Sequence, residues 1–290
     1  MKVLVIGKNG QLGKSIKINT PINECNNFSF IGRDDLDLNN SSSIRNYFED
    51  KNFDLIINCA AFTNVDKAEE DIQTANQINH LAVAELAKIV SLKKSKLIHI
   101  STDYVFDGKS SIAYSESDKV NPINVYGKTK LNGENAILKE LPNNTIIIRT
   151  SWLYSEFGNN FVDTILRLGR INNSLKVVDD QIGSPTYATD LAKAILNIIK
   201  SRYYEENFKT RIYHFSNSGS CSWYDLAKEI FEFTATECDL IPILTSEYPT
   251  KAMRPKNTYM SNNRIISVFQ VQQAHWKESL KKCLSFLQDK

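Results

Sequence analysis

The chain has 290 residues, 42% of them hydrophobic and 23% charged, which is typical of a globular protein of one or two domains. Its 35 Lys and Arg residues nearly balance 33 Asp and Glu residues, so charge gives no case for a nucleic acid or a membrane as partner. No apolar run approaches the roughly 18 residues that a membrane span needs, and residues 1–6 resemble a strand rather than a signal peptide. We therefore expect a cytoplasmic protein. Five scattered Cys and four scattered His residues predict reduced thiols and no metal site.

A predicted buried strand and a glycine-rich turn open the chain. Residues 2–6 read KVLVI, and Gly7, Gly10 and Gly13 follow at a spacing of three. After a strand and before a helix, such glycines let the backbone approach the pyrophosphate of a dinucleotide. The spacing is not the commoner Gly-x-Gly-x-x-Gly, and a glycine triplet can be a plain tight turn. Its place directly after the first strand favours the dinucleotide site.

The end of the second predicted strand bears on the choice of cofactor. This strand covers residues 28–31 and is followed by Gly32, Arg33 and Asp34. An acidic residue normally holds the adenosine ribose hydroxyls near this point, whereas the guanidinium of Arg33 could bind a 2′-phosphate. We therefore favour NADPH and leave NADH open. If the strand ends two residues away, Arg33 is instead a surface charge.

Strands and helices alternate in the first half of the chain. Further strands are expected at residues 54–58, 97–100 and 145–149, with helices around 44–48 and 75–92. This alternation predicts an α/β fold, a Rossmann-like doubly wound parallel sheet that binds ligands at the carboxyl ends of its strands. We expect residues 1–150 to form the dinucleotide-binding domain. Residues 151–290 should form mainly a smaller substrate-binding lobe, with segments near 177–215 returning to the first domain.

Tyr126 and Lys130 lie four residues apart, just after the turn signal Asn121-Pro122. On a helix they would share one face, and an ammonium beside a phenol lowers the pKa of the phenol. Such a pair can protonate a carbonyl oxygen while a hydride arrives at carbon, although Tyr-x-x-x-Lys also arises by chance. Thr102, at the expected end of a strand, could bind the same oxygen or could simply cap a turn.

Together these motifs resemble the extended short-chain dehydrogenase/reductase family and, within it, the dTDP-4-dehydrorhamnose reductases. The segments that carry the likeness span nearly the whole chain, at residues 7–13, 58–69, 101–106, 124–130, 149–152, 158–161, 180–186 and 254–255. The resemblance implies that Thr102, Tyr126 and Lys130 form the catalytic triad, with Tyr126 as proton donor and Lys130 on the nicotinamide ribose.

The resemblance also implies binding residues. Together with the glycine turn and the small residues after the third strand, the expected cofactor contacts are Gly7, Gly10, Gln11, Leu12, Gly13, Arg33, Asp37, Leu38, Ala60, Ala61, Phe62, Thr63, Tyr126 and Lys130. Thr102, Asp103 and Trp152 would contact the sugar nucleotide. Arg254 could clamp a diphosphate bidentately or be one more surface charge. Trp223 and Trp276 have no such support and are expected to pack in the core.

Two positions depart from related proteins. Related sugar nucleotide dehydratases carry a Glu where this chain has Tyr104, so we expect reduction without water elimination. Some members of the family form a dimer around a magnesium ion held partly by a Glu of the first helix, and Ser15 stands at that position. A homodimer of this chain is therefore expected to lack a magnesium bridge.

The resemblance implies reduction of dTDP-4-dehydro-L-rhamnose at C4 by NADPH, giving dTDP-L-rhamnose for cell-envelope polysaccharide. Two alternatives stay open. The chain could reduce another 4-keto sugar nucleotide. It could also be a non-catalytic NADP-binding subunit similar to the regulatory subunit of methionine adenosyltransferase, which the intact Thr102, Tyr126 and Lys130 disfavour.

Overall fold

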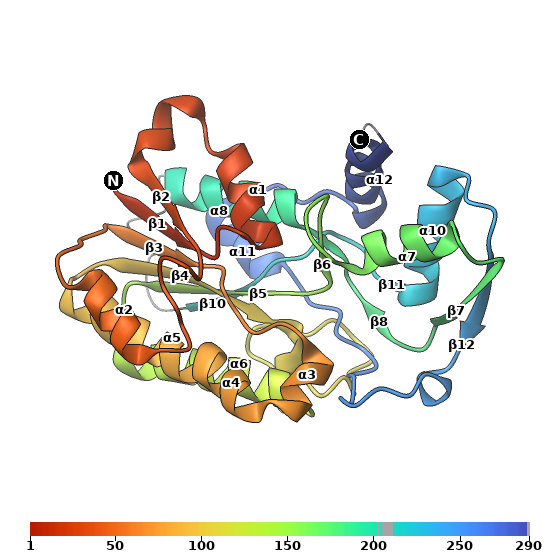
Figure 1. The fold of residues 1–290 in the computed structure, drawn as a ribbon, viewed down its shortest axis with the longest axis horizontal. Helices are drawn as coiled ribbons and strands as arrows, with labels where there is room; N and C mark the ends of the chain where they lie inside the picture. Colours follow the sequence, from red (N-terminus) through yellow and green to blue (C-terminus); the bar gives the residue numbers. More distant parts are fainter. Residues whose placement is uncertain (202–203, 205–210, 289–290) are drawn as a thin grey trace.

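A six-stranded parallel sheet lies at the centre of the computed structural model, which describes residues 1–201, 204 and 211–288 (Figure 1). The strand order is β10-β5-β4-β3-β1-β2. The strands are β1 (Val3–Ile6), β2 (Phe28–Ile31), β3 (Leu55–Asn58), β4 (Lys96–Thr102), β5 (Thr145–Thr150) and β10 (Arg211–His214). All of their pairings are parallel, so the predicted doubly wound α/β fold is confirmed. Residues 202, 203 and 205–210, which belong to the segment expected to return to the sheet, lie outside the described residues.

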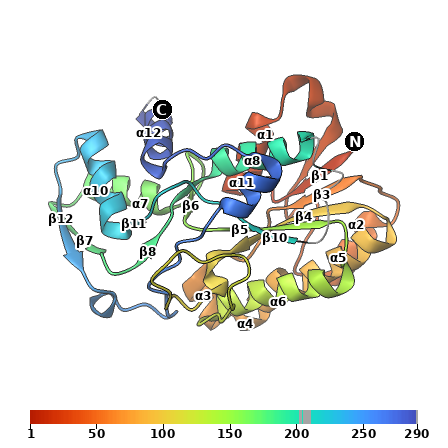
Figure 2. The same cartoon turned by 180° about the vertical axis from the view of Figure 1, so that it is seen from behind.

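Helices cover both faces of this sheet (Figures 1 and 2). One face carries α1 (Gln11–Asn19), α8 (Ala188–Lys200) and α11 (Asn263–Phe269); the other carries α2 (Ser41–Phe48), α5 (Ala82–Leu92) and α6 (Val125–Glu140). Because side chains alternate along a strand, β1 sends Val3 and Val5 into the first core and Leu4 and Ile6 into the second. Strands buried on both faces read as continuous apolar runs, which explains why they were visible in the sequence.

A second group of elements forms the right-hand part of the molecule in Figure 1. It contains α7 (Phe161–Gly169), α10 (Trp223–Thr234), α12 (Trp276–Gln288) and the strand pairs β7 (Ser174–Val178) with β12 (Asp239–Ile243), β6 (Leu153–Tyr154) with β9 (Thr186–Tyr187), and β8 (Ile182–Gly183) with β11 (Cys221–Ser222). Ile165, Ile230 and Leu280 come from its three helices and share one core. This lobe therefore has its own hydrophobic cluster beside the sheet.

The helix expected at residues 75–92 has an irregular start. It comprises α4 (Ile72–Asn76), a π-helical segment η2 (Gln77–Leu81) and then α5. The side chain of Asn79 points inward, where its Oδ1 accepts from Phe62 N at 2.8 Å and its Nδ2 donates to Phe62 O at 3.0 Å. Nδ2 also donates to Thr129 Oγ1 at 3.2 Å. The hydrogen bonds of Asn79 thus connect the segment that follows β3 with helix α6.

Short helices complete the described structure. They are η1 (Ile22–Asn27), α3 (Val65–Glu70), η3 (Asp103–Val105) and η4 (Thr245–Glu247). None of the helices within the described residues is long and apolar enough to cross a membrane. Both α3 and η3 lie directly beyond the carboxyl ends of sheet strands, where a parallel sheet binds its ligands.

Candidate active site

The glycine-rich turn joins β1 to α1. Gly7 has φ +100°, which L side chains rarely adopt, and a Cβ at Gly13 would lie only 2.2 Å from the carbonyl oxygen of Gly7. Only glycine therefore fits the turn, and α1 begins at Gln11 directly after it. The amino end of α1 lies at the carboxyl end of β1, the arrangement that holds a pyrophosphate.

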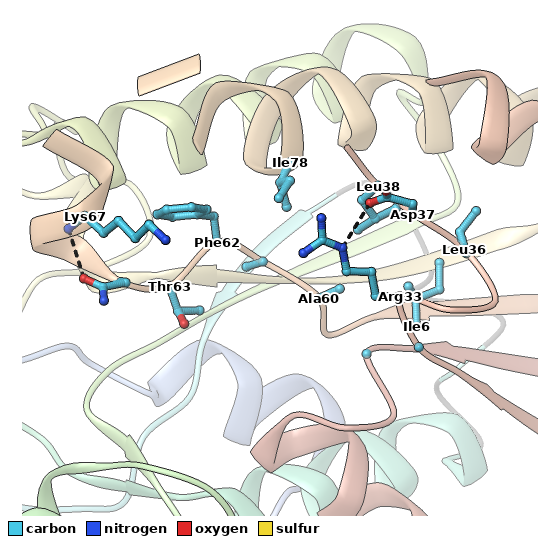
Figure 3. Close-up of a pocket in the computed structure, with 14 residues that line it drawn as sticks. Ile6, Arg33, Leu36, Asp37, Leu38, Ala60, Phe62, Thr63, Lys67 and Ile78 are labelled. Carbon is cyan, nitrogen blue, oxygen red and sulfur yellow. Dashed lines mark hydrogen bonds and ion pairs between the residues drawn. The ribbon is translucent and has the colours of Figure 1, made fainter. Parts of the chain in front are cut away.

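A pocket of about 460 Å³ opens beside this turn (Figure 3). Of the residues expected to contact a cofactor, it brings together Gly7, Arg33, Asp37, Leu38, Ala60, Ala61, Phe62 and Thr63. Its lining does not include the other expected contacts, namely Gly10, Gln11, Leu12, Gly13, Tyr126 and Lys130. The side chain of Gln11 instead joins the turn to the second lobe, where its Oε1 accepts from Ser155 Oγ at 2.9 Å and from Asn160 Nδ2 at 3.0 Å.

Two basic side chains, Arg33 and Lys67, line this pocket, and Lys8 lies near it. Arg33 is 77% exposed and its Nε lies 3.5 Å from Asp37 Oδ1, a weak surface pair that leaves the guanidinium available for a phosphate. Figure 3 shows Arg33 and Lys67 on opposite sides of Ile78. Lys8, beside Gly32, donates to Asp35 at 2.6 Å. Neither Lys8 nor Lys67 was predicted as a binding residue, although Lys8 directly follows the first glycine of the turn. The glycine turn, the pocket and the basic side chains together fit the binding of a phosphorylated dinucleotide.

The catalytic candidates Thr102, Tyr126 and Lys130 come together where β4 ends against the start of α6. The helix begins after Asn124, whose Oδ1 accepts from Gly127 N at 2.8 Å. A Cβ at Gly127 would lie 2.2 Å from Tyr104 O, so glycine lets α6 pack closely against the chain after Thr102. Lys130 Nζ donates to Ile100 O at 2.7 Å, and the side chain of Thr102 hydrogen-bonds Tyr126.

Burial controls the protonation of this group. It raises the pKa of Tyr126 to about 12, against the hydrogen bond from Thr102, which lowers it. Burial also lowers the pKa of Lys130 to about 8, although Glu134 and Cys59 act to raise it. Desolvation therefore outweighs the effects that lower the pKa of Tyr126, and in this structure the amine of Lys130 faces the carbonyl oxygen of Ile100. Tyr126 is consequently a neutral phenol, the form that can donate a proton.

A buried ion pair lies below the catalytic candidates and was not found from the sequence. Glu134 follows Lys130 by one turn of α6, and its carboxylate accepts from Arg149 Nε at 2.9 Å and Nη2 at 2.6 Å. Ser101 Oγ, next to Thr102, donates to Glu134 Oε1 at 2.5 Å. The sequence feature that could have indicated Glu134 is its spacing of four residues from Lys130, which places both side chains on one face of the helix. The pair ties β4, β5 and α6 together beneath the site.

Aromatic side chains form the wall of the second lobe. The rings of Trp152 and Trp223 stack with centroids 3.5 Å apart and an interplanar angle of 6°. Trp223 Nε1 donates to Gln181 Oε1 at 3.2 Å. Trp223 packs against the core of this lobe, as expected, and it also lines a pocket of about 270 Å³. Trp276 is 3% exposed and lies in the core, as predicted.

Arg254 lines that same pocket, and its guanidinium pairs with Asp66 of α3. Its Nη2 lies 2.6 Å from Asp66 Oδ2, and its Nη1 donates to Asp66 Oδ1 at 3.2 Å. It also lines an adjoining pocket of about 510 Å³ that includes Lys67 of the cofactor pocket. Arg254 thus lies between the two parts of the site.

Asp103 is 2% exposed, and burial raises its pKa to about 6. Its Oδ1 accepts from Thr102 Oγ1 at 3.0 Å, so it adjoins the catalytic candidates. Among residues 1–201, 204 and 211–288, no group of three or more His, Cys, Asp or Glu is placed to hold a metal ion. Ser15, at the position considered for a magnesium ligand, is buried in α1.

Comparison with known proteins gives consistent matches along the chain. The model of the RmlD substrate binding domain family matches residues 1–288. A dTDP-4-dehydrorhamnose reductase of Aggregatibacter actinomycetemcomitans is 37% identical over 291 residues, covering 98% of this chain and 99% of the relative. A dTDP-4-keto-6-deoxy-D-glucose reductase of Streptomyces niveus is 32% identical over 290 residues, covering 98% and 96%.

One solved structure is informative about a ligand. The dTDP-4-dehydrorhamnose reductase of Bacillus anthracis, solved in complex with NADP, superposes with a TM-score of 0.91 at 38% identity and covers 99% of this chain and 100% of that one. The match of fold, of full length and of sequence leads to one conclusion. The chain belongs to the RmlD substrate binding domain family, together with the dTDP-4-dehydrorhamnose reductases.

Proposed function

We propose that this protein reduces dTDP-4-dehydro-L-rhamnose at C4 to dTDP-L-rhamnose with NADPH, a step of dTDP-rhamnose biosynthesis that supplies cell-envelope polysaccharide. The observation that carries the proposal is that Thr102, Tyr126 and Lys130 come together where β4 ends against the start of α6. Family membership and the relatives' names support it.

The chemistry divides between the cofactor and the chain. NADPH, when bound, supplies the hydride. Tyr126, kept neutral by burial, gives its proton to the C4 oxygen. Thr102 donates a hydrogen bond to the same oxygen when its hydroxyl proton turns from Asp103 Oδ1 to the substrate. The ammonium of Lys130 stabilises the phenolate left behind and holds a ribose hydroxyl of the cofactor. Asp103 and Trp152 would line the sugar, and Arg254 would bind the diphosphate bidentately.

Cofactor binding is proposed along the carboxyl ends of β1, β2 and β3. Gly7, Gly10, Gln11, Leu12 and Gly13 would approach the pyrophosphate. The exposed guanidinium of Arg33, supported by Lys8, would bind a 2′-phosphate, which favours NADPH over NADH.

The test is NADPH oxidation in the presence of dTDP-4-dehydro-L-rhamnose generated in the same tube. We expect loss of the reduced-nicotinamide absorbance that requires the sugar nucleotide and is about two orders of magnitude or more slower in Tyr126→Phe. Product identity is checked by NMR of the isolated sugar nucleotide. Oxidation that continues without the sugar nucleotide, or equally in Tyr126→Phe, would refute the proposal.

A second candidate is reduction of a different 4-keto sugar nucleotide, which is favoured by the relative named dTDP-4-keto-6-deoxy-D-glucose reductase. Assaying dTDP-4-keto-6-deoxy-D-glucose beside dTDP-4-dehydro-L-rhamnose separates the two by kcat/KM. If NADPH binds and neither sugar is reduced, the non-catalytic regulatory reading takes precedence.

We further propose that residues 1–150 bind the cofactor and that residues 151–290 mainly bind the substrate, with β10 serving the first part. The separate hydrophobic cluster of the second lobe supports this division. We also propose that the protein acts in the cytoplasm and that any homodimer forms without a magnesium bridge, since Ser15 offers no carboxylate. Sedimentation with and without a chelator tests the latter, and a chelator-dependent mass would refute it.

A further inference from the structure

Helix α3 carries two carboxylates on one face, Asp66 and Glu69, to which the proposed chemistry gives no part. Asp66 faces the loop before α11. Its Oδ1 accepts from Ala252 N at 3.0 Å and from Arg254 Nη1 at 3.2 Å, and its Oδ2 accepts from Arg254 Nη2 at 2.6 Å. The hydrogen bond from Arg254 is the main reason that the pKa of Asp66 is lowered. Asp66 therefore fixes both the backbone and the guanidinium of this loop.

Glu69 faces the catalytic helix instead. Its Oε1 accepts from Val125 N at 2.8 Å, and Val125 is the first residue of α6 and the neighbour of Tyr126. An amide at this position has no partner within its own helix, so the carboxylate of Glu69 satisfies it and stabilises the helix start. Through Glu69, α3 is thus attached to the turn of the proton donor, and through Asp66 it is attached to Arg254.

A third contact closes the arrangement. Asn124 caps α6 through its Oδ1, while its Nδ2 donates to Met253 O at 2.8 Å. Helix α3, the first turn of α6 and residues 252–254 therefore form a ring of hydrogen bonds. This ring of hydrogen bonds lies beside the reacting groups. Arg254 interacts electrostatically with Tyr104, and the aromatic rings of Tyr104 and Tyr126 meet edge-on with their centroids 5.7 Å apart.

This ring matters because of the shape of a sugar nucleotide. The diphosphate and the keto carbon of a sugar nucleotide are separated by several rotatable bonds. The distance between the residue that binds the diphosphate and the residue that donates the proton therefore selects the substrate conformation that can react. We propose that Asp66 and Glu69 are positioning residues: Asp66 orients Arg254 for the diphosphate, Glu69 orients the turn of Tyr126, and α3 keeps the two at a fixed separation. The inference rests on the proposed function of Arg254 and Tyr126.

The first test replaces Asp66 by Asn, which keeps the shape and loses the charge. Because the guanidinium is no longer held by a charged partner, we expect about tenfold weaker binding of dTDP, or about 1.4 kcal/mol, and a similar rise in KM for the sugar nucleotide. The Kd for NADPH should stay within about twofold. In an Arg254→Gln background, Asp66→Asn should add nothing, because its effect acts through Arg254. Unchanged dTDP affinity in Asp66→Asn, or a full additional loss in the double variant, overturns the assignment of Asp66.

The second test separates the two carboxylates. Glu69→Ala frees the Val125 amide and should lower kcat several-fold while dTDP affinity is kept, and Glu69→Gln should restore kcat because its amide oxygen still accepts that hydrogen bond. Glu70→Gln is the matched control, since Glu70 lies on the same helix and pairs with exposed Lys251 of the same loop. It should leave kcat and dTDP affinity unchanged. Glu69→Ala with normal kcat, or a loss that Glu69→Gln does not restore, overturns the assignment of Glu69.

Failure of the proposed function would look different. If the unmodified protein binds dTDP and NADPH without consuming NADPH, the reductase assignment fails, and dTDP binding to Asp66→Asn still tests Asp66. If the unmodified protein turns over the sugar nucleotide and Asp66→Asn binds dTDP normally, only the inference about α3 fails.

Discussion

The buried amine of Lys130 makes a prediction that joins stability to activity. Lys130 is 1% exposed, and burial lowers its pKa from 10.5 in an ordinary lysine to about 8. Below about pH 8 both folded and unfolded chains carry the proton, and folding must bury an ammonium. Between about pH 8 and the unfolded value of 10.5 the folded protein gives up this proton while the unfolded chain keeps it. The cost of burying Lys130 is therefore relieved as pH rises.

The magnitude follows from the shift. Each pH unit in which the unfolded chain holds one extra proton adds about 1.4 kcal/mol to stability, so the whole shift corresponds to roughly 3 kcal/mol. From about pH 7 to about pH 9 the folded amine goes from mostly protonated to mostly neutral, and the gain is roughly 1 kcal/mol. Lys130→Met is a suitable reference because it keeps the length of the side chain and removes the titration.

Urea unfolding of both proteins across this pH range measures the effect. The free energy of unfolding of the unmodified protein, minus that of Lys130→Met, should rise by roughly 1 kcal/mol between about pH 7 and about pH 9. Groups present in both proteins cancel in this difference. A flat difference would falsify the lowered pKa, and a falling difference would mean that Glu134 stabilises the ammonium by more than burial destabilises it.

The titration of Lys130 should also appear in the activity, which should fall with rising pH while the stability rises. The pH dependence of kcat/KM reports the free enzyme, and Tyr126, with a pKa of about 12, stays protonated well above pH 8. A decline in kcat/KM above about pH 8 therefore belongs to loss of the Lys130 ammonium, and the residual activity of Lys130→Met should lack it. A decline of equal size in Lys130→Met would assign it to another group.

Three further substitutions test the rest of the site. Tyr126→Phe should leave NADPH affinity nearly intact in a fluorescence titration and lower kcat by about two orders of magnitude or more, and near-normal turnover would exclude Tyr126 as the proton donor. Gly13→Ala places a Cβ 2.2 Å from Gly7 O, so the turn must move and NADPH should bind at least about tenfold more weakly; unchanged affinity would contradict the pyrophosphate assignment. Arg33→Ala should reduce the preference for NADPH over NADH by about tenfold in the ratio of kcat/KM values, and an unaltered ratio would show that Arg33 is a surface charge.

The sheet was predictable because its central strands are buried on both faces and read as uninterrupted apolar runs. Residues 2–6, for example, were predicted as a strand, and β1 covers Val3–Ile6 with all four residues buried. The glycine turn was predictable for a similarly local reason, since positive φ and close packing leave little choice but glycine. The helix at residues 75–92 shows the limit. Its apolar stripe is compatible with either α or π geometry, and the π segment contains Asn79, whose side chain hydrogen-bonds the backbone of Phe62, seventeen positions earlier in the chain.

The protonation of Tyr126 was not predictable from its spacing to Lys130. The spacing correctly places both residues on α6, yet the pKa depends on how much protein surrounds the phenol and on where the amine points. Lys130 donates to a carbonyl of β4, and that partner is thirty positions earlier in the chain. Local sequence fixes which side chains are neighbours on a helix, whereas the neighbouring strand decides their electrostatics.

The aromatic wall of the second lobe shows how such distant contacts build a binding surface. Trp152 has φ +48°, a left-handed conformation that costs a non-glycine residue about 1–3 kcal/mol and persists only where the surroundings enforce it. Here the surroundings are the stacked ring of Trp223 and the backbone at Gly183, where a Cβ would lie 2.5 Å from the Trp152 ring. Trp223 is the first residue of the amphipathic helix α10, and a tryptophan in such a helix is expected from the sequence to pack in the core. The stack therefore holds Trp152 in its strained conformation beside the proposed substrate pocket, and the indole is oriented before any sugar nucleotide binds.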